Sequence, residues 1–217
     1  MPVYEAGRWP SGDQFYAMKL VDGRSLSDVI EDCSSLEERL ALLPAVIDVA
    51  EAIAYAHSER IIHRDLKPAN VLLGPFGETV VIDWGLAKDL RSPEEQRADE
   101  PGAARRPNGD SPPPQAYDTA DGIIVGTLQY MPPEQAYAQD VDERADVYAL
   151  GAMLYEVLTG LRPYEDVPQE DVLRRVRSTP PRPVHELAPK VPAELVTIVE
   201  KAMARRPEDR YPTAREM

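Results

Sequence analysis

Apolar residues near the start and middle of the chain are arranged as two short hairpins. Residues 15–21 read as a strand that ends at the turn pair Asp22-Gly23, and residues 3–6 read as its partner. The runs 71–73 and 79–82 flank Gly74-Pro75-Phe76-Gly77, which predicts a second, tighter hairpin.

Apolar residues at steps of three and four predict one long helix over residues 36–57. Its predicted inward face consists of Leu36, Leu40, Leu43, Ile47, Ala50 and Ala54. Pro44 should bend this helix, because proline removes a backbone donor. Since Val46, Val49 and Ile53 lie on the other side, we expect the helix to be largely buried.

A second long helix is predicted over residues 142–159, where Gly160 ends the apolar pattern. Weaker helical patterns follow over residues 169–177 and 193–204. Residues 213–217 look like the opening of a further helix. These segments make the second half of the chain mainly helical.

Residues 91–118 differ in composition from the rest of the chain. They hold six of the 22 prolines, many charges and almost no large apolar residue. Such a segment buries too little surface to offset its ordering entropy, so we predict that it is disordered.

Composition restricts the kinds of partner and compartment. The 217 residues are 43% hydrophobic and 29% charged, as in an ordinary globular protein. A net charge of −14 argues against nucleic acid or an anionic membrane surface as the main partner. The single cysteine, Cys33, excludes an intrachain disulfide, and no apolar run reaches the ~18 residues of a membrane span. We therefore expect a cytoplasmic protein without a membrane segment.

The strongest chemical signal is the run His63-Arg64-Asp65-Leu66-Lys67-Pro68-Ala69-Asn70, followed by Val81-Ile82-Asp83-Trp84-Gly85. It combines two carboxylates, one amide and one lysine at a spacing that suits metal-assisted phosphoryl transfer. Taken singly, Asp65 and Lys67 could be a solvated ion pair and Asn70 a turn residue. Their joint spacing favours the functional interpretation.

These two runs resemble the catalytic loop and the Asp-Phe-Gly element of protein kinases, with Trp84 at the Phe position. The chain is thus similar to the catalytic domain of bacterial, eukaryotic-like (Hanks-type) serine/threonine protein kinases. The resemblance implies that Asp65 accepts the proton of the substrate hydroxyl and that Lys67 contacts the γ-phosphate of ATP. It also implies that Asn70 and Asp83 ligate Mg²⁺ through hard oxygens.

The same resemblance extends to the segment 126–134, with Pro132 in place of the usual Ala, and to the second predicted helix. It implies that Thr127 lines the substrate site and contacts Asp65. Glu134 is expected to form a buried ion pair with Arg210. Asp146 is expected to support the catalytic-loop backbone, and His63 to act as a structural brace.

The resemblance also assigns nucleotide-binding and regulatory positions. Met18 would lie at the back of the nucleotide pocket, Lys19 to Val21 would form the hinge that contacts adenine, and Leu72 would lie under the adenine ring. Arg64, which precedes the catalytic Asp, implies regulation by phosphorylation, because a bound phosphate would offset its charge. Thr119 is our candidate acceptor, and an ordinary loop threonine is an equal alternative.

The predicted fold is α+β and protein-kinase-like: residues 1–21 form a two-strand remnant of the small lobe, and residues 22–217 form the helical lobe. No Gly-x-Gly or Val-Ala-x-Lys occurs before Phe15, so we expect the chain to cover only part of the family's domain. The native product could have a fuller small lobe or further domains. Protein substrates are the expected partners. Two alternatives are a pseudokinase or scaffold without activity and a kinase-like small-molecule phosphotransferase.

Overall fold

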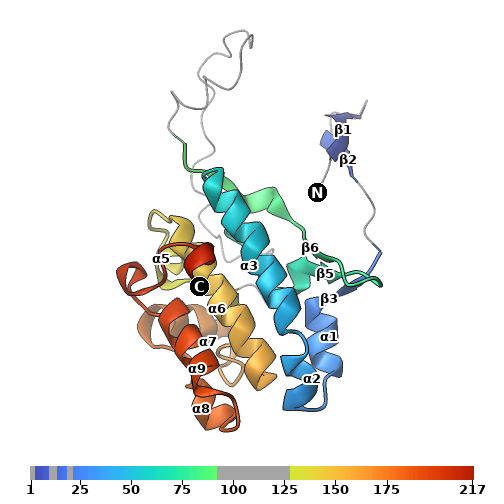
Figure 1. Ribbon diagram of the computed structural model, residues 1–217. Helices are drawn as coiled ribbons and strands as arrows, with labels where there is room; N and C mark the ends of the chain where they lie inside the picture. Colours follow the sequence, from blue (N-terminus) through green and yellow to red (C-terminus); the bar gives the residue numbers. More distant parts are fainter. Residues whose placement is uncertain (1–2, 10–13, 19–21, 92–127) are drawn as a thin grey trace.

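The computed structural model describes residues 3–9, 14–18, 22–91 and 128–217 (Figure 1). The helices are α1 Leu26–Asp32, α2 Leu36–Leu40, α3 Leu43–Ser58, α5 Pro133–Ala136, α6 Glu143–Thr159, α7 Gln169–Ser178, α8 Val184–Leu187 and α9 Ala193–Ala202. The strands are β1 Val3–Arg8, β2 Gln14–Met18, β3 Arg24–Ser25, β4 Ile61–Ile62, β5 Val71–Leu73, β6 Thr79–Val81 and β7 Lys88–Asp89. Short 3₁₀ turns are η1 Pro68–Asn70, η2 Trp84–Leu86, η3 Leu128–Tyr130, η4 Pro207–Asp209 and η5 Ala214–Glu216.

Both predicted hairpins are present. β1 and β2 pair antiparallel, and β5 pairs antiparallel with β6 in the register Val71↔Val81. Two further pairings were not predicted from the sequence: β3 joins the other edge of β5, and β4 pairs with β7. Strands of two residues carry too little alternation to be recognised in a sequence.

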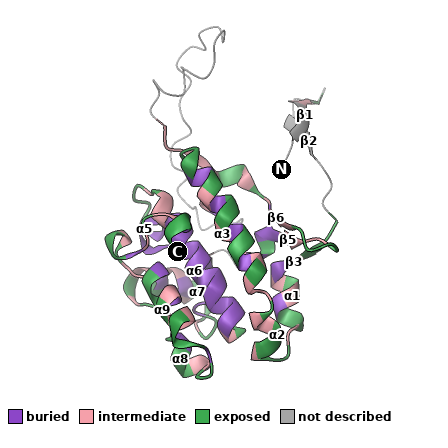
Figure 2. Ribbon diagram, in the orientation of Figure 1, coloured by how far each residue is buried: buried purple, intermediate pink, exposed green. Residues whose placement is uncertain are grey.

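The predicted helix over residues 36–57 is two helices, and one residue of its predicted inward face, Ile47, was assigned wrongly. α2 ends at Leu40, and α3 begins at Leu43 with Pro44 in its first turn, where a proline costs no hydrogen bond. Val46, Val49 and Ile53 are buried, and the other five predicted residues are partly buried against the same core, whereas Ile47 is 58% exposed. Figure 2 shows that buried and exposed positions alternate along α3.

α6 forms the centre of the helical lobe, and almost every position along it is buried (Figure 2). It packs against α3 on one side and α9 on another. Gly151 permits the close approach to α9, because a Cβ there would lie 2.7 Å from the Cβ of Ala202. As predicted, Gly160 ends the helix, and it does so in the left-handed conformation at φ 73°.

The remaining elements differ little from the predicted ones. α7 and α9 occupy the two weaker helical patterns, and residues 214–216 form a single 3₁₀ turn. α1 was not predicted, although Ser25 caps it by accepting a hydrogen bond from the backbone N–H of Asp28. The segment 91–118 lies outside the described residues except for Arg91.

By length and composition, the stretch Leu36–Ser58 could cross a membrane. In the structure the stretch is divided between α2 and α3, and α3 packs its buried residues into the core beside α6. Core helices of soluble proteins pass the same test, so the stretch is weak evidence for a span.

Candidate active site

The predicted catalytic loop leads from β4 through η1 into β5, and its backbone is fixed by a buried carboxylate on α6. Asp146, 1% exposed, accepts hydrogen bonds from the backbone N–H groups of His63 (2.8 Å) and Arg64 (2.9 Å). Arg64 adopts φ 67°, a left-handed conformation that costs a non-glycine residue roughly 1–3 kcal/mol. The charge-assisted hydrogen bonds that Asp146 accepts offset this strain.

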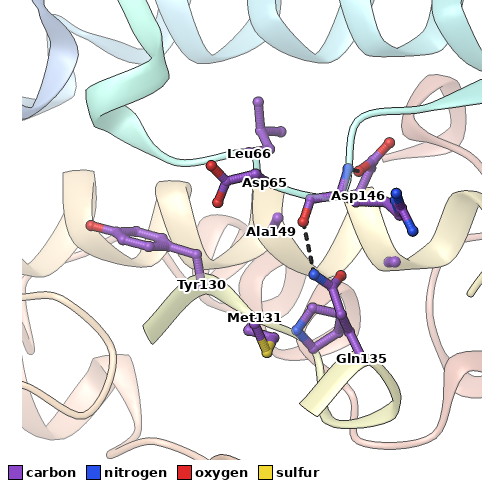
Figure 3. A pocket seen from close by; sticks show the side chains of 10 residues that line it. Asp65, Leu66, Tyr130, Met131, Gln135, Asp146 and Ala149 are labelled. Carbon is purple, nitrogen blue, oxygen red and sulfur yellow. Dashed lines mark hydrogen bonds between the residues drawn. The ribbon is translucent and has the colours of Figure 1, made fainter. Parts of the chain in front are cut away.

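Two residues that sequence analysis did not assign to the site complete this support. His57, near the end of α3, places its Nε2 3.0 Å from Asp146 Oδ2. Gln135 on α5 donates from Nε2 to the carbonyl of Arg64 at 2.9 Å. Figure 3 shows Gln135 and Met131 facing Asp146 and Asp65 across a small cavity. The position of Gln135 directly after Glu134 was the only sequence signal for its role.

His63 links the catalytic loop to the strand that precedes Asp83. It is fully buried; its Nε2 lies 3.1 Å from the carbonyl oxygen of Ile82, and its Nδ1 accepts from the backbone N–H of Asp65 at 3.3 Å. These contacts fit a neutral imidazole with the proton on Nε2. The ring also lies 4.6 Å from that of Trp84. His63 therefore has the geometry of a brace.

Asp65, Lys67 and Asn70 converge at the start of β5. Asp65 Oδ2 accepts from Lys67 Nζ at 2.8 Å and from Asn70 Nδ2 at 3.2 Å. Asn70 Nδ2 also donates to the Asp65 carbonyl at 2.8 Å. Asp65 is 9% exposed, and its Oδ1 has no hydrogen-bond partner among the described residues. The site thus contains a carboxylate with one oxygen held by Lys67 and Asn70 and one buried oxygen that has no hydrogen-bond partner among the described residues.

The hairpin brings Asp83 to the same end of the sheet as Asn70. The N–H of Ile82, next to Asp83, donates to the carbonyl of Asn70 at 2.9 Å. Asp83 is exposed and adopts φ 62°, which turns the chain sharply into η2. Because the amide nitrogen of Asn70 is bonded to Asp65, its Oδ1 remains as a ligand. One carboxylate and one amide oxygen fit Mg²⁺, which usually binds few protein ligands together with phosphate oxygens.

Among the described residues, no group of three or more His, Cys, Asp or Glu side chains is placed to hold a metal ion.

The side chain of Arg64 donates from Nε to the carbonyl of Leu86 in η2, so it reaches the turn that follows Asp83. Leu72 lies in β5, partly buried, where β5 is flanked by β3 and β6.

The ion pair predicted between Glu134 and Arg210 is present. Arg210 donates to both carboxylate oxygens of Glu134, at 2.7 and 2.8 Å, and its side chain is fully buried. It also donates to the carbonyls of Arg144 and Ala204 and lies over the ring of Tyr148. This bidentate pair ties α5 to the end of the helical lobe.

A second buried carboxylate, Glu156 on α6, accepts a hydrogen bond from the hydroxyl of Tyr130 in η3. Burial raises the pKa of Glu156 to about 7, although the Tyr130 hydroxyl and Arg162, 3.7 Å away, act in the opposite direction. Burial also raises the pKa of Tyr130. The contact joins the segment before α5 to the central helix.

Several predicted site residues lie outside the described part of the chain. These are Thr127, Thr119, Lys19 and Val21, together with the side chain of Met18, whose backbone ends β2. Their assigned roles stay predictions.

Comparison with known proteins agrees with this geometry. The protein kinase domain model matches residues 6–217. The serine/threonine-protein kinase PknB of Mycolicibacterium smegmatis is 36% identical over 99% of this chain and 31% of its own length. PknD of Protochlamydia amoebophila, also named a serine/threonine-protein kinase, is 32% identical over 100% of this chain and 23% of its own length.

The tyrosine-protein kinase MasK of Myxococcus xanthus is likewise 36% identical, over 98% of this chain and 31% of its own length. The chain thus spans about a third or less of the length of these curated relatives. The match to the family model covers nearly all of the chain. The chain belongs to the protein kinase family.

Proposed function

We propose that this chain transfers the γ-phosphate of Mg-ATP to serine or threonine hydroxyls of proteins. The observation that carries the proposal is the Asp65 carboxylate: Oδ2 is held by Lys67 and Asn70, while Oδ1 has no partner among the described residues. An oriented carboxylate with one oxygen free of hydrogen bonds within the described residues is suited to accept a proton from an attacking hydroxyl.

The neighbouring side chains would stabilise the phosphate charge and bind the metal ion. Lys67, whose ammonium lies 2.8 Å from Asp65, would place a positive charge beside the transferred phosphoryl group. Asn70 Oδ1 and the Asp83 carboxylate would hold Mg²⁺, which neutralises phosphate charge when bound. Asp146 and His63 touch no reacting atom in this account; they hold the backbone that carries Asp65.

The choice of hydroxyl rests on the relatives. PknB and PknD are named serine/threonine-protein kinases, whereas MasK is named a tyrosine-protein kinase. We adopt serine and threonine because the first two names agree with the interpretation of the catalytic-loop sequence. Phosphorylation at Thr119, with Arg64 as the partner of the phosphate, remains part of the proposal.

The test separates proton acceptance from metal binding. Asp65→Asn should reduce transfer of radiolabelled phosphate by about 10²- to 10⁴-fold and leave Mg-ATP binding within twofold, because general bases contribute factors of that size. Asp83→Asn should instead weaken Mg²⁺-dependent nucleotide binding. Asp140→Asn, a change at an exposed position, serves as the control.

Equal transfer by wild type and Asp65→Asn would overturn the proposal. If neither protein transfers phosphate although both bind the same partner proteins, the scaffold alternative is favoured instead.

A further inference from the structure

A second cavity lies in the helical lobe, outside the residues assigned to phosphoryl transfer. It has a volume of about 260 Å³ and is formed by α6, the connection between α7 and α8, and α9. Cavities that hold small ligands typically measure about 300–1,000 Å³, so this one suits a small molecule of modest size. Its lining consists of Tyr155, Pro180, Pro181, Arg182, Pro183, Val184, Val199, Glu200, Met203, Ala204 and Arg205.

The inner part of the cavity is apolar apart from one hydroxyl. Val184, Val199 and Met203 are buried there, and the rest of the apolar lining is mostly proline. Tyr155 is 2% exposed as a residue, and in the described part of the chain its hydroxyl makes no hydrogen bond but is not among the buried unsatisfied atoms, so it is accessible from the cavity. A ligand that supplies an acceptor would give this hydroxyl the hydrogen bond that it lacks within the described residues.

Tyr155 is a hydrogen-bond donor at neutral pH. Burial raises the pKa of its hydroxyl to about 12, so the proton is retained. The charge of Arg182 lowers that pKa, which places the guanidinium within electrostatic reach of the hydroxyl, while Asp166 and Glu186 raise it. Charges of both signs therefore act on the hydroxyl of Tyr155, and the charge of Arg182 has the largest effect on its pKa.

The charged residues of the lining favour an anion. Arg182 is exposed at the rim, and within the described residues it forms no ion pair or hydrogen bond. Arg205 is fixed by donating to the carbonyls of Val176 and Arg177, which keeps its charge at the wall. Glu200 is the opposing charge, so the lining has two cations and one anion.

We propose that this cavity binds a small carboxylic acid with an apolar body, either a single aromatic ring or a short alkyl chain. The body packs on Val184, Val199 and Met203. The carboxylate accepts the Tyr155 hydrogen bond and pairs with Arg182.

The experiment uses 4-phenylbutyrate as the probe and its neutral amide as the matched ligand. Calorimetry gives the affinities, and methyl NMR signals of Val184, Val199 and Met203 report where the ligand lies. The acid should bind about tenfold or more tightly than the amide and should shift these methyl signals. An excess of Mg-ATP should not displace it, because the cavity shares no lining residue with the one beside Asp65.

Two variants test the polar contacts, and a third is the control. Tyr155→Phe keeps the ring and should weaken binding of the acid about 3- to 10-fold, the range expected for one hydrogen bond. Arg182→Gln, at the exposed rim, should weaken it about tenfold and bring it close to the amide. Arg174→Gln changes an exposed arginine that pairs with Asp171 on α7 outside the cavity, and it should have no effect.

Four results would overturn the inference: no binding of the acid at millimolar concentration, equal affinity for acid and amide, displacement by Mg-ATP, or unchanged affinity in Arg182→Gln. The last result is decisive even if Tyr155→Phe alters stability, because Arg182 is exposed and supports no other described contact.

Discussion

Arg210→Ala is the perturbation whose effect on stability can be worked out most fully from the structure. The change removes a fully buried guanidinium and the bidentate pair with Glu134. It also leaves the carbonyls of Ala204 and Arg144 without these donors. The lost cation–π contact with Tyr148, 4.9 Å from the guanidinium carbon to the ring centroid, adds to the cost.

Breaking one side of a buried ion pair costs about 3–5 kcal/mol, because the remaining charge stays buried and unpaired. That is a large part of the roughly 5–15 kcal/mol that stabilises a typical domain. For a chain of this length, 1 kcal/mol lowers the melting temperature by about 2–4 °C. Arg210→Ala should therefore lower it by roughly 6–20 °C and make the region around α5 sensitive to protease.

Calorimetry and limited proteolysis measure both effects, with Arg206→Ala as the control. Arg206 is exposed and pairs with Glu208 at the surface, so its loss should leave the melting temperature nearly unchanged. The double change Glu134→Gln with Arg210→Met should be less harmful than Arg210→Ala alone, because no buried charge remains. The reasoning is refuted if Arg210→Ala melts within 2 °C of Arg206→Ala.

Two further predictions concern carboxylates on or beside α6. Asp146→Asn should lower the free energy of unfolding in urea by about 1.5–3 kcal/mol, because the new NH₂ group would face the N–H of His63 or Arg64, which is also a donor. Asp142→Asn, at the N-cap of α6, should leave the free energy of unfolding nearly unchanged. Equal losses of stability in the two variants would contradict the bracing role of Asp146. Burial raises the pKa of Glu156 from 4.5 to about 7, so its protonated form stabilises the fold below pH 4.5 and this contribution is lost as the pH rises to about 7. The free energy of unfolding of Glu156→Gln should therefore rise by roughly 3 kcal/mol relative to that of the wild type between pH 4.5 and 7.5. Curves of unfolding free energy against pH that run parallel for the two proteins would contradict this prediction.

The long helices and the β5–β6 hairpin could be predicted from the sequence because several signals, such as apolar spacing and turn residues, indicate each of them. α6 carries apolar residues around most of its circumference and a glycine at its end, and the β5–β6 hairpin has a loop of turn residues. The catalytic loop and the Glu134–Arg210 pair were identified by motif, since chemistry restricts which residue types can occupy those positions. α1 had a detectable signal in Ser25 and Asp28 that was not used.

Other features depend on tertiary contacts that a local pattern does not contain. Whether Ile47 or Val46 faces the core is decided by where α6 lies, because both fit a helical stripe. The left-handed conformations of Arg64 and Asp83 cannot be predicted from residue type, since neither residue is glycine. Likewise, burial raises the pKa of Glu156, and this burial depends on how the elements around α6 pack.

The identity of the phosphorylated amino acid tests the central claim most directly. The chain would be incubated with radiolabelled Mg-ATP and a basic protein substrate, and the products hydrolysed for phosphoamino acid analysis. The account predicts label on phosphoserine and phosphothreonine, lost in Asp65→Asn. Label on phosphotyrosine alone, or an equal amount of label with Asp65→Asn, would contradict it.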